Sequence, residues 1–236
     1  MKIVSIHQPQ YIPWVPYFDK ALQSDVFVLL DHVQFEKNGM QNRNQIKSPQ
    51  GPLWLTLPVK HNFGQSILET QISDPRAAAK HIKTLQMCYK KAPFYDEIMP
   101  LLEEPLSAGY TSLSVLCCDI TVRILSYLEY QGTVMNSSQM NVEGRSSDLV
   151  LNICKSLDAE VYIAGQGGKN YMKLEDFEAA GVKVVFQKYS NQEYTQCYSK
   201  VGFCKDLSII DLLFNAGPES LAVLKKGRVS EVSLQG

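Results

Sequence analysis

Short apolar segments recur along the chain, and their lengths and boundaries are typical of buried β-strands. The run KIVSI at 2–6 ends abruptly at His7, and VFVLLD at 26–31 is apolar up to its final aspartate. Uninterrupted apolar runs of roughly four to eight residues are typical of strands in a parallel sheet that is covered on both faces. Three later segments also have the character of strands. The five predicted strands lie at 2–6, 26–31, 53–59, 160–165 and 182–189.

Helical patterns lie between these strands. Apolar residues between 14 and 22 share one face of a helix, and residues 146–158 open with serines and an aspartate before a helical period begins. Between about 75 and 130 the pattern predicts two helices, the first ended by Pro93 and the second apolar enough to be buried. Two short helices separated by Gly217-Pro218 are predicted near the C-terminus.

Strands that alternate with helices predict an α/β fold. The expected architecture is a Rossmann-like, mostly parallel sheet of about five strands, with helices on both faces and a helical insertion. A chain of 236 residues fits a single domain, 1–236, with the helical insertion at about 75–130 and the C-terminal helices at about 207–226. The polar stretch 32–50 is expected to be a loop or an excursion from the sheet.

Composition and charge narrow the class of protein. Apolar residues make up 45% of the chain and charged residues 20%, which is typical of globular proteins. The net charge of −1, with Lys and Arg spread along the chain, disfavours nucleic acid as the main ligand. No apolar run reaches the roughly 18–20 residues of a membrane span, and no signal-peptide pattern opens the chain, so a cytoplasmic protein is expected.

The cysteines are expected to be reduced and structural. Cys117, Cys118 and Cys154 lie within apolar helical patterns, and the six cysteines show no short Cys-x-x-Cys spacing. The four histidines form no close-spaced pair, so no structural metal is predicted. Asp211 lies on an otherwise apolar helix and would need a hydrogen-bonding partner if it is buried.

Polar residues follow several of the predicted strands at the point where each strand ends. His7 and Gln8 follow the first strand, Asp31 closes the second, residues 60–61 follow the third, and the glycine-rich turn 165–169 follows the fourth. Ligands of an open parallel sheet bind beyond the carboxyl ends of its strands. These groups are therefore expected to gather at one end of the sheet.

His7 is the main catalytic candidate, and Asp31 is the second. His7 begins a loop made rigid by two prolines, in which Gln8, Tyr11 and Trp14 are expected to bind substrate. The alternative for His7 is a loop histidine bonded only to the backbone. Asp31 closes a buried strand, where it either orients a catalytic group or caps the next turn, and both roles remain open.

The segment from residue 34 to residue 47 is dense in amide and cationic side chains. Such donors suit phosphate, carboxylate or sugar hydroxyl groups. The alternative is a solvated loop, but apolar residues at 33, 35 and 40 would anchor this segment to the protein. The substrate-binding candidates in it are Lys37, Asn38, Gln41, Asn42 and Arg43.

The run AGQGGKNYM offers a glycine-rich turn after the fourth strand. Its backbone N–H groups are suited to cradle a phosphate, with Lys169 as counter-charge. Gly165, Gly168, Lys169 and Tyr171 are therefore binding candidates. The run matches neither a Walker A loop nor GxGxxG, and a simple tight turn is the alternative.

The chain resembles the WbqC-like protein family in the segment IHQPQYIPWVPYFDKALQSDVFVLLDHVQFEKNGMQNRNQIK and in the WLTLPV segment that follows it. Further matching pieces are VYIAGQGGKNYM, Tyr194-Thr195-Gln196 and LSIIDLLFNAG, so the resemblance covers nearly the whole length. This family is associated with bacterial surface-polysaccharide (O-antigen) gene clusters and has been proposed to include glycine transferases.

The resemblance implies a transferase that places a glycyl or other small (amino)acyl group on an amino sugar or sugar nucleotide in lipopolysaccharide O-antigen biosynthesis. The expected partners are a small-molecule sugar nucleotide and an acyl donor. Aminoacyl-tRNA is the least favoured donor, because the chain is nearly neutral. His7 would act as the base, and the amides and Arg43 of the 34–47 segment would stabilise charge.

The first strand–loop–helix unit also resembles the nucleotidyltransferase and class I synthetase superfamily, in which paired histidines after the first strand contact nucleotide phosphates. Here a single His7 and two prolines replace the paired histidines. This alternative implies adenylation or nucleotidyl transfer, with ATP or a sugar nucleotide and Mg²⁺ bound by His7 and Lys169. A non-catalytic module that binds a sugar nucleotide is the third alternative. The sequence leaves the donor, the acceptor and the oligomeric state open.

Overall fold

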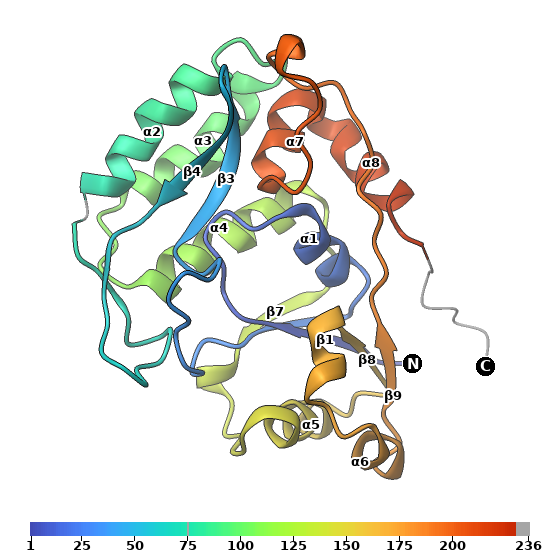
Figure 1. The fold of residues 1–236 in the computed structure, drawn as a ribbon. Coiled ribbons are helices and arrows are strands. Elements are labelled where there is room, and N and C mark those ends of the chain that lie inside the picture. The colour runs from blue at the N-terminus through green and yellow to red at the C-terminus, as the bar shows by residue number, and fades with distance from the viewer. Residues whose placement is uncertain (75, 230–236) are drawn as a thin grey trace.

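A five-stranded parallel sheet forms the centre of the structure, a computed structural model that describes residues 1–74 and 76–229 (Figure 1). The spatial order of its strands is β7-β2-β1-β8-β9, so β1 lies in the middle. Every neighbouring pair is parallel, with Val4 opposite Val26 on one side and Tyr162 on the other. The strands are β1 (Ile3–His7), β2 (Val26–Leu29), β7 (Thr133–Asn136), β8 (Val161–Ala164) and β9 (Lys183–Phe186).

Helices cover both faces of this sheet, which confirms the predicted α/β, Rossmann-like fold. On one face Phe27 and Leu29 of β2 pack into a core with α1 (Val15–Leu22) and with the helices that follow residue 75 and residue 208. On the other face Val4 and Ile6 of β1 pack against α5 (Ser146–Ser156) and α6 (Leu174–Ala179). The three inner strands β1, β2 and β8 are thus buried from both sides, as their uninterrupted apolar runs predict.

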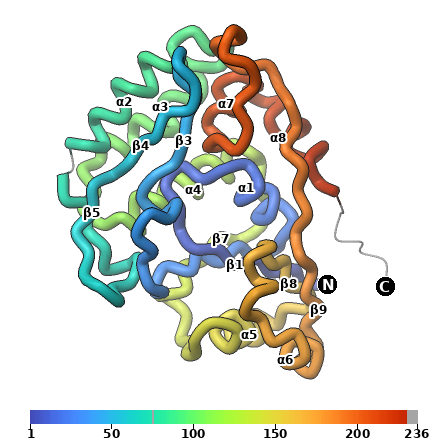
Figure 2. The backbone as a smooth tube through the Cα atoms, in the orientation of Figure 1, coloured from blue at the N-terminus to red at the C-terminus, as the bar shows by residue number. Residues whose placement is uncertain are grey.

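The helical half consists of two groups of helices on the α1 side of the sheet (Figures 1 and 2). Helices α2 (Arg76–Tyr89), α3 (Tyr95–Ser107) and α4 (Leu113–Tyr127) form the first group. Helices α7 (Ile209–Ala216) and α8 (Ser220–Lys226) form the second. Where the pattern predicted two helices between 75 and 130, the structure has three, because α3 forms despite Pro100 and Pro105 and buries its apolar face.

The fifth strand of the sheet is not the one predicted. Residues 53–59 belong mainly to β4 (Gly51–Thr56), which forms an antiparallel hairpin with β3 (Arg43–Ser48) outside the sheet. The place in the sheet is taken by β7, a four-residue edge strand whose side chains are partly exposed. A short edge strand need not be strongly apolar, so it leaves no clear pattern in the sequence.

Smaller elements complete the chain. A second two-stranded ladder joins β5 (Val59–Lys60) to β6 (Gln71–Ile72), and four 3₁₀ turns are present. These turns are η1 (Ser137–Gln139), η2 (Gln166–Asn170), η3 (Ser199–Val201) and η4 (Gly217–Glu219). All six cysteines are free thiols. Among the described residues, no helix is both long and apolar enough to cross a bilayer. Residue 75 and residues 230–236, which the predicted domain included, lie outside the described residues.

Candidate functional site

A depression opens at the carboxyl ends of β1 and β8, in the middle of the sheet. The chain leaves β1 towards β2 on one side and leaves β8 towards β9 on the other, so the strand order reverses between them. This is the topological switch point at which open α/β sheets bind ligands. The strand order corresponds to the 3-2-1-4-5 part of the doubly wound arrangement. The sheet thus creates a crevice where the sequence placed His7 and the glycine-rich turn.

The depression has two lobes that meet at shared residues. The glycine lobe has a volume of about 300 Å³ and the tryptophan lobe about 400 Å³, within the usual range for small-molecule sites. Both lobes are lined by His7, Lys20, Gly165 and Gly167. The glycine lobe adds Gln8, Tyr162, Gly168 and Tyr171. The tryptophan lobe adds Trp14, Gln187, Tyr189, Asn191 and Asp206.

His7 is the last residue of β1, and its imidazole is held as a neutral base. The ring packs on Tyr17 with its centroid 4.7 Å away, and Nδ1 lies 3.2 Å from the carbonyl oxygen of Gln8. Burial, and then the nearby Lys20, lower the pKa of His7 well below its usual value, against the opposing effect of the Gln8 carbonyl. We assign the proton to Nδ1, which donates to Gln8, so Nε2 keeps its lone pair.

Lys20 is a functional candidate that the sequence reading missed. It lies on α1 with only 2% of its surface exposed, and its Nζ donates to the carbonyl oxygen of Ile6 at 2.8 Å. Burial lowers the pKa of Lys20 to about 7. The sequence does contain a sign of this role, because Lys20 lies three residues after Tyr17 and so shares its apolar helix face. A search for apolar periodicity does not identify it, because lysine is counted as polar.

Replacing Lys20 with Met is expected to stabilise the fold at pH 7. The pKa of Lys20 in the folded state, about 7, lies below that of an unfolded lysine, so burying the charged amine lowers the free energy of unfolding. This loss of stability is largest below pH 7 and disappears as the pH rises towards 10. Methionine removes this cost but leaves the Ile6 carbonyl unpaired, for a net gain of roughly 1–3 kcal/mol. Urea unfolding at pH 7 measures the change, and a loss of stability would contradict the expectation.

Gln8 lines the glycine lobe and is held from behind by Gln41. The Gln8 Oε1 accepts a hydrogen bond from Gln41 Nε2 at 2.8 Å, and Gln41 Oε1 accepts one from the backbone N–H of Glu36 at 2.7 Å. Gln41 is 2% exposed and both ends of its amide are engaged. Gln41, expected to bind substrate directly, therefore positions Gln8 instead.

The other candidates of the 34–47 segment turn away from both lobes. Asn42 donates to the carbonyl oxygen of Leu57 at 2.8 Å and so fastens the β3–β4 hairpin. The guanidinium of Arg43 lies over the Trp54 ring at 4.6 Å. Its Nη2 donates to the carbonyl oxygen of Asn38. The segment was predicted as a donor surface, but in the structure its side chains mainly satisfy its own turn and hairpin.

Lys37, Asn38 and Tyr11 also lie outside the two lobes. Lys37 and Asn38 are exposed, and Asn38 has a positive φ of 68° within the turn. Tyr11 is fully buried, with its hydroxyl 2.7 Å from Nδ1 of His81. Of the aromatic residues predicted in the first loop, Trp14 alone lines a lobe, and it is 36% exposed.

Asp31 has the structural role that the sequence left open. Its carboxylate accepts hydrogen bonds from Ser137 Oγ at 3.0 Å, Ser138 N at 2.8 Å and Ser138 Oγ at 2.7 Å. It therefore caps the η1 turn that follows β7, and it lines neither lobe. Asp31, a candidate catalytic residue, therefore lies outside the depression.

The glycine-rich turn 165–169 lines both lobes with its glycines, but its Lys169 side chain lies outside them. An added Cβ at Gly165 or Gly167 would meet no atom within 4 Å, so the lobes reach the bare backbone there. Gly168 is buried against Met172, and Tyr171 forms part of the wall while 48% exposed. The ammonium of Lys169 lies over the Phe186 ring at 5.3 Å and belongs to neither lobe, so Lys169 is not placed as the expected counter-charge.

Lys60 and His61 do not reach this end of the sheet. Both were expected there as the end of a third parallel strand, but Lys60 belongs to the β5–β6 ladder. The His61 ring packs on Phe35 with the centroids 4.9 Å apart. The expectation was wrong because the strand before them belongs to the hairpin rather than to the sheet.

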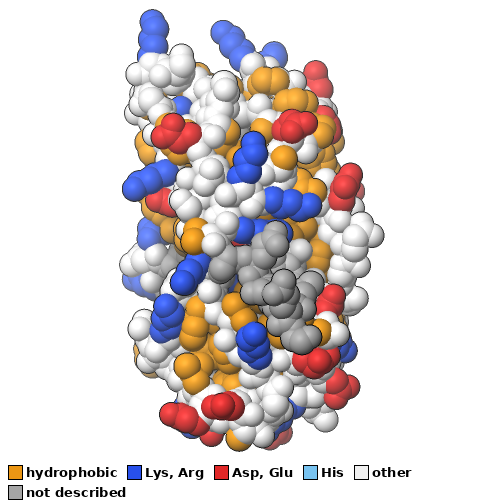
Figure 3. Space-filling model, turned by 90° about the vertical axis from the view of Figure 1, so that its right-hand side faces the viewer, with side chains coloured by type: hydrophobic (Ala, Val, Ile, Leu, Met, Phe, Trp, Pro, Cys, Tyr) orange, Lys and Arg blue, Asp and Glu red, His pale blue; other side chains and the backbone are white. Residues whose placement is uncertain are grey.

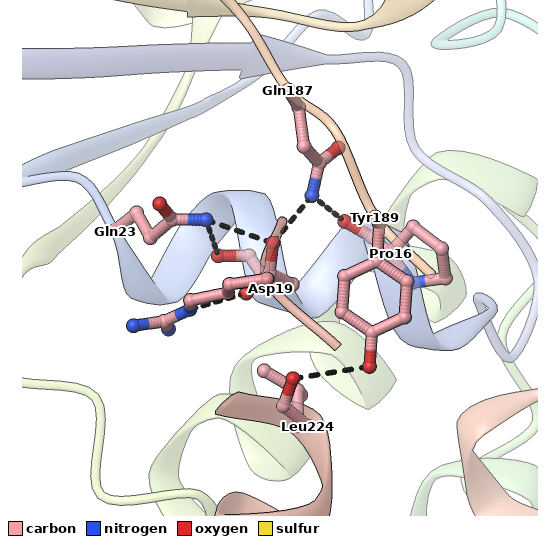
Figure 4. A network of polar contacts seen from close by, with 7 residues as sticks. Pro16, Asp19, Gln23, Gln187, Tyr189 and Leu224 are labelled. Atoms are coloured by element: carbon pink, nitrogen blue, oxygen red, sulfur yellow. Dashed lines mark hydrogen bonds and ion pairs between the residues drawn. The ribbon is translucent and has the colours of Figure 1, made fainter. Parts of the chain in front are cut away.

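A buried polar network (Figure 4) includes Gln187 and Pro16, which line the tryptophan lobe. Asp19 of α1 pairs with Arg228 at 2.6 Å and accepts from Gln187 at 2.7 Å and Gln23 at 2.8 Å. Burial raises the pKa of Asp19, and the hydrogen bonds with Arg228 and Gln187 oppose that rise. Gln187 also donates to the carbonyl oxygen of Pro16. The network therefore fastens the segment after β9 and the C-terminal region to α1.

Residues from the end of β9 onward were missed as site residues. Gln187, Asn191 and Asp206 come from a segment that runs from the sheet edge past α1 and α8 towards the top of the helical half (Figures 1 and 2). The sequence has no periodicity there, so nothing in it indicates that these residues face His7. In the part of the chain that the structure describes, no group of three or more His, Cys, Asp or Glu side chains is arranged to hold a metal ion.

Comparison with known proteins assigns the chain to a family. The model of the WbqC-like protein family matches residues 8–223, which include most of the residues lining both lobes. A protein of Mycobacterium tuberculosis (strain ATCC 25618 / H37Rv), described as uncharacterized protein Rv1507c, is 34% identical over 224 residues, covering 93% of this chain and 96% of the relative. No solved structure matches the chain significantly. The chain belongs to the WbqC-like protein family.

Proposed function

We propose that this protein is an enzyme that transfers a glycyl or other small (amino)acyl group to an amino sugar or sugar nucleotide in bacterial surface-polysaccharide biosynthesis. The observation that carries the proposal is the position of His7, which lines both lobes at the switch point of the sheet. Burial lowers the pKa of His7, which favours the neutral imidazole that a base requires. A transfer of this kind needs a base that accepts a proton from the attacking group. The chain belongs to the WbqC-like family, which has been proposed to include glycine transferases.

His7 serves both proton transfers of this reaction. Its Nε2 takes the proton of the acceptor amine or hydroxyl as that group forms a bond to the carbonyl carbon of the donor. The tetrahedral intermediate then collapses, the C–O or C–S bond to the donor's leaving group breaks, and the imidazolium returns the proton to that leaving group. The Nδ1–H bond to the Gln8 carbonyl fixes the ring and its tautomer throughout.

The two lobes suit two substrates that meet at His7. Trp14 and Tyr189 give the tryptophan lobe aromatic surface, while Asn191 and Asp206 give it amide and carboxylate groups suited to hydroxyl and amino groups of a sugar. The glycine lobe leaves bare backbone at Gly165 open to the other substrate. Lys and Arg side chains are spread over the face shown in Figure 3, and the net charge of the chain is −1, which favours a small donor over a tRNA.

Mass spectrometry gives the direct test. The purified protein is incubated with an amino-sugar nucleotide and glycine in three activated forms: glycyl-tRNA, glycyl-CoA, or glycine with ATP. A mass gain of one glycyl unit on the sugar nucleotide supports the proposal and identifies the donor. An unchanged mass with every donor, together with identical surface glycans in cells with and without the protein, contradicts it.

The pH profile of the reaction tests the state of His7. Because burial lowers the pKa of His7 below its usual value of 6.5, the imidazole stays neutral and competent as a base at pH 6.5. We expect any decline of kcat/KM on the acid side to lie below pH 6.5. Rates are measured from pH 5 to 8 in buffers of constant ionic strength. A half-maximal point at or above pH 6.5 that disappears in His7→Gln would contradict this expectation.

The strand order favours a second candidate function, adenylation or nucleotidyl transfer. A 3-2-1-4-5 parallel sheet with a cavity at its switch point is the arrangement that binds nucleotides in doubly wound folds. ATP or CTP with Mg²⁺ and candidate acids or sugar phosphates should then release pyrophosphate. Pyrophosphate release would favour this candidate, whereas turnover with preactivated acyl donors alone would eliminate it.

A further inference from the structure

Lys20 is a buried lysine that lines the cavity, and no counter-charge faces its amine among the described residues. Within residues 1–74 and 76–229, its amine makes one hydrogen bond, to the neutral carbonyl of Ile6. Among the residues that the structure describes, no carboxylate oxygen lies within 4.0 Å of its Nζ. Asp19, its neighbour on α1, is already paired with Arg228. A buried lysine keeps its charge when an anion pairs with it, so an anion is the group that would hold Lys20 in its charged form.

The other titratable side chains that line the two lobes place no negative charge beside Lys20, where the lobes meet. The β1 residue His7 is neutral, and the phenols of Tyr162, Tyr171 and Tyr189 have raised pKa values because of burial. Asp206 is the one carboxylate among the described lining residues of the two lobes. It belongs to the tryptophan lobe and accepts a hydrogen bond from Asn191.

The backbone beside Lys20 leaves room for an anion with several oxygens. Gly165 and Gly167 line both lobes together with Lys20, and neither position would bring an added Cβ within 4 Å of another atom. Bare backbone of this kind allows the close approach of a phosphate, whose oxygens take hydrogen bonds from N–H groups and an ammonium at the same time. A carboxylate presents fewer oxygens to the same set of groups.

We propose that Lys20 binds a phosphate group of the substrate at the junction of the two lobes. The inference takes the cavity of the proposed function as its starting point, and it names the chemistry that anchors one substrate there. A sugar nucleotide and a nucleoside triphosphate both carry such a group.

Proton uptake follows from the state of Lys20 before binding. At pH 8 most of the amine is neutral, because burial lowers its pKa to about 7. A bound dianion favours the ammonium and raises that pKa, so binding consumes a proton above pH 7. The affinity for the anion is therefore highest below pH 7, where Lys20 is already protonated. Above pH 7 it falls by up to about tenfold per pH unit, until the pKa of the complex is reached.

Isothermal titration calorimetry with sulfate measures both the proton uptake and the affinity. Sulfate is a suitable probe because it is a dianion that does not itself titrate in this pH range. Titrations at pH 8 in two buffers of different ionisation enthalpy should show an uptake close to one proton per site. The affinity should fall about tenfold between pH 7.5 and 8.5. Equal affinity at both pH values, or binding without proton uptake, would overturn the proposal, and neither result depends on turnover or on the identity of the acyl donor.

Variants assign the proton to Lys20. Lys20→Met should lose sulfate binding, and His7→Gln should retain both binding and proton uptake. Lys169→Met is the matched control, because Lys169 lies over Phe186 outside both lobes, and it should behave as the native protein does. Loss of the uptake in His7→Gln, with binding kept, would assign the proton to His7 and refute the proposal.

NMR of the unmodified protein keeps the proposal testable if Lys20→Met does not fold. With ¹³C-labelled lysine, one resonance should titrate near pH 7 and move to higher pH with saturating sulfate. ADP and UDP should each displace sulfate, and the tighter of the two identifies the nucleoside that accompanies the phosphate. Failure of sulfate, ADP and UDP to shift any lysine resonance, or stronger displacement by acetate than by either nucleotide, would overturn the assignment of a phosphate.

Discussion

Replacing His7 with Ala should lower kcat/KM for the transfer reaction by roughly 10²–10⁴-fold, the usual contribution of a general base. The loss has a local cause, since the side chain makes one hydrogen bond to the Gln8 carbonyl and one ring contact with Tyr17. We therefore expect the variant to fold with nearly native stability. Initial rates with the donor identified by mass spectrometry, together with the circular dichroism melting curve, measure both effects.

The control for His7 is His61→Ala. His61 is a partly exposed histidine that packs on Phe35 away from both lobes, so its removal should leave the rate unchanged within about twofold. Loss of turnover in His7→Ala with intact substrate binding supports the assignment of the base. A folded His7→Ala variant that still supports full modification of the polysaccharide would refute that assignment and favour the non-catalytic binding module.

Replacing Asp211 with Ala is expected to destabilise the fold by roughly 3–5 kcal/mol, the range for an uncompensated buried charge. Asp211 is fully buried on α7 and accepts from the hydroxyls of Tyr89 and Tyr194 at 2.8 Å each and from Gln196 Nε2 at 2.8 Å. The same Gln196 accepts from the buried ammonium of Lys47 at 2.9 Å. Alanine leaves these donors without an acceptor and removes a carboxylate that interacts with Lys47.

Urea unfolding at pH 7 measures this loss through the shift of the midpoint at constant slope. Asp211→Asn keeps one acceptor oxygen and should lose less than the alanine variant. The exposed Asp176 on α6 provides the surface control, and Asp176→Ala should change the stability by no more than about 0.5 kcal/mol. A loss below about 1 kcal/mol in Asp211→Ala would show that the network adds little to the fold.

Much of the site could be predicted from the first strand and the first loop. The abrupt end of an apolar run at His7, followed by two prolines, placed a polar residue at the carboxyl end of a buried strand. Parallel strands bring their carboxyl ends to the same edge, so Gly165 could be paired with His7 although they lie far apart in the sequence. The buried partners of Asp211 were likewise expected, because a carboxylate on an apolar helix needs them.

Some predictions failed because the same side chains or segments can have two different roles in a fold. Asn42 and Gln41 have the side chains of a binding surface, but in the folded chain they satisfy the backbone and the Gln8 amide. The amide chemistry is the same in both roles, so composition does not distinguish them. Residues 53–59 are apolar enough for a central strand, yet pairing with β3 takes them into the hairpin.

The sequence by itself determined the class of fold, the covered parallel strands and the position of His7 at a strand end, because hydrophobic period and proline are local properties of the chain. Tertiary structure alone decided which strands are neighbours, that Lys20 meets His7 in the cavity, and that the segment after β9 closes the tryptophan lobe. Those features depend on pairing and burial between distant segments. The pKa of Lys20 is lowered only when such segments exclude water from α1.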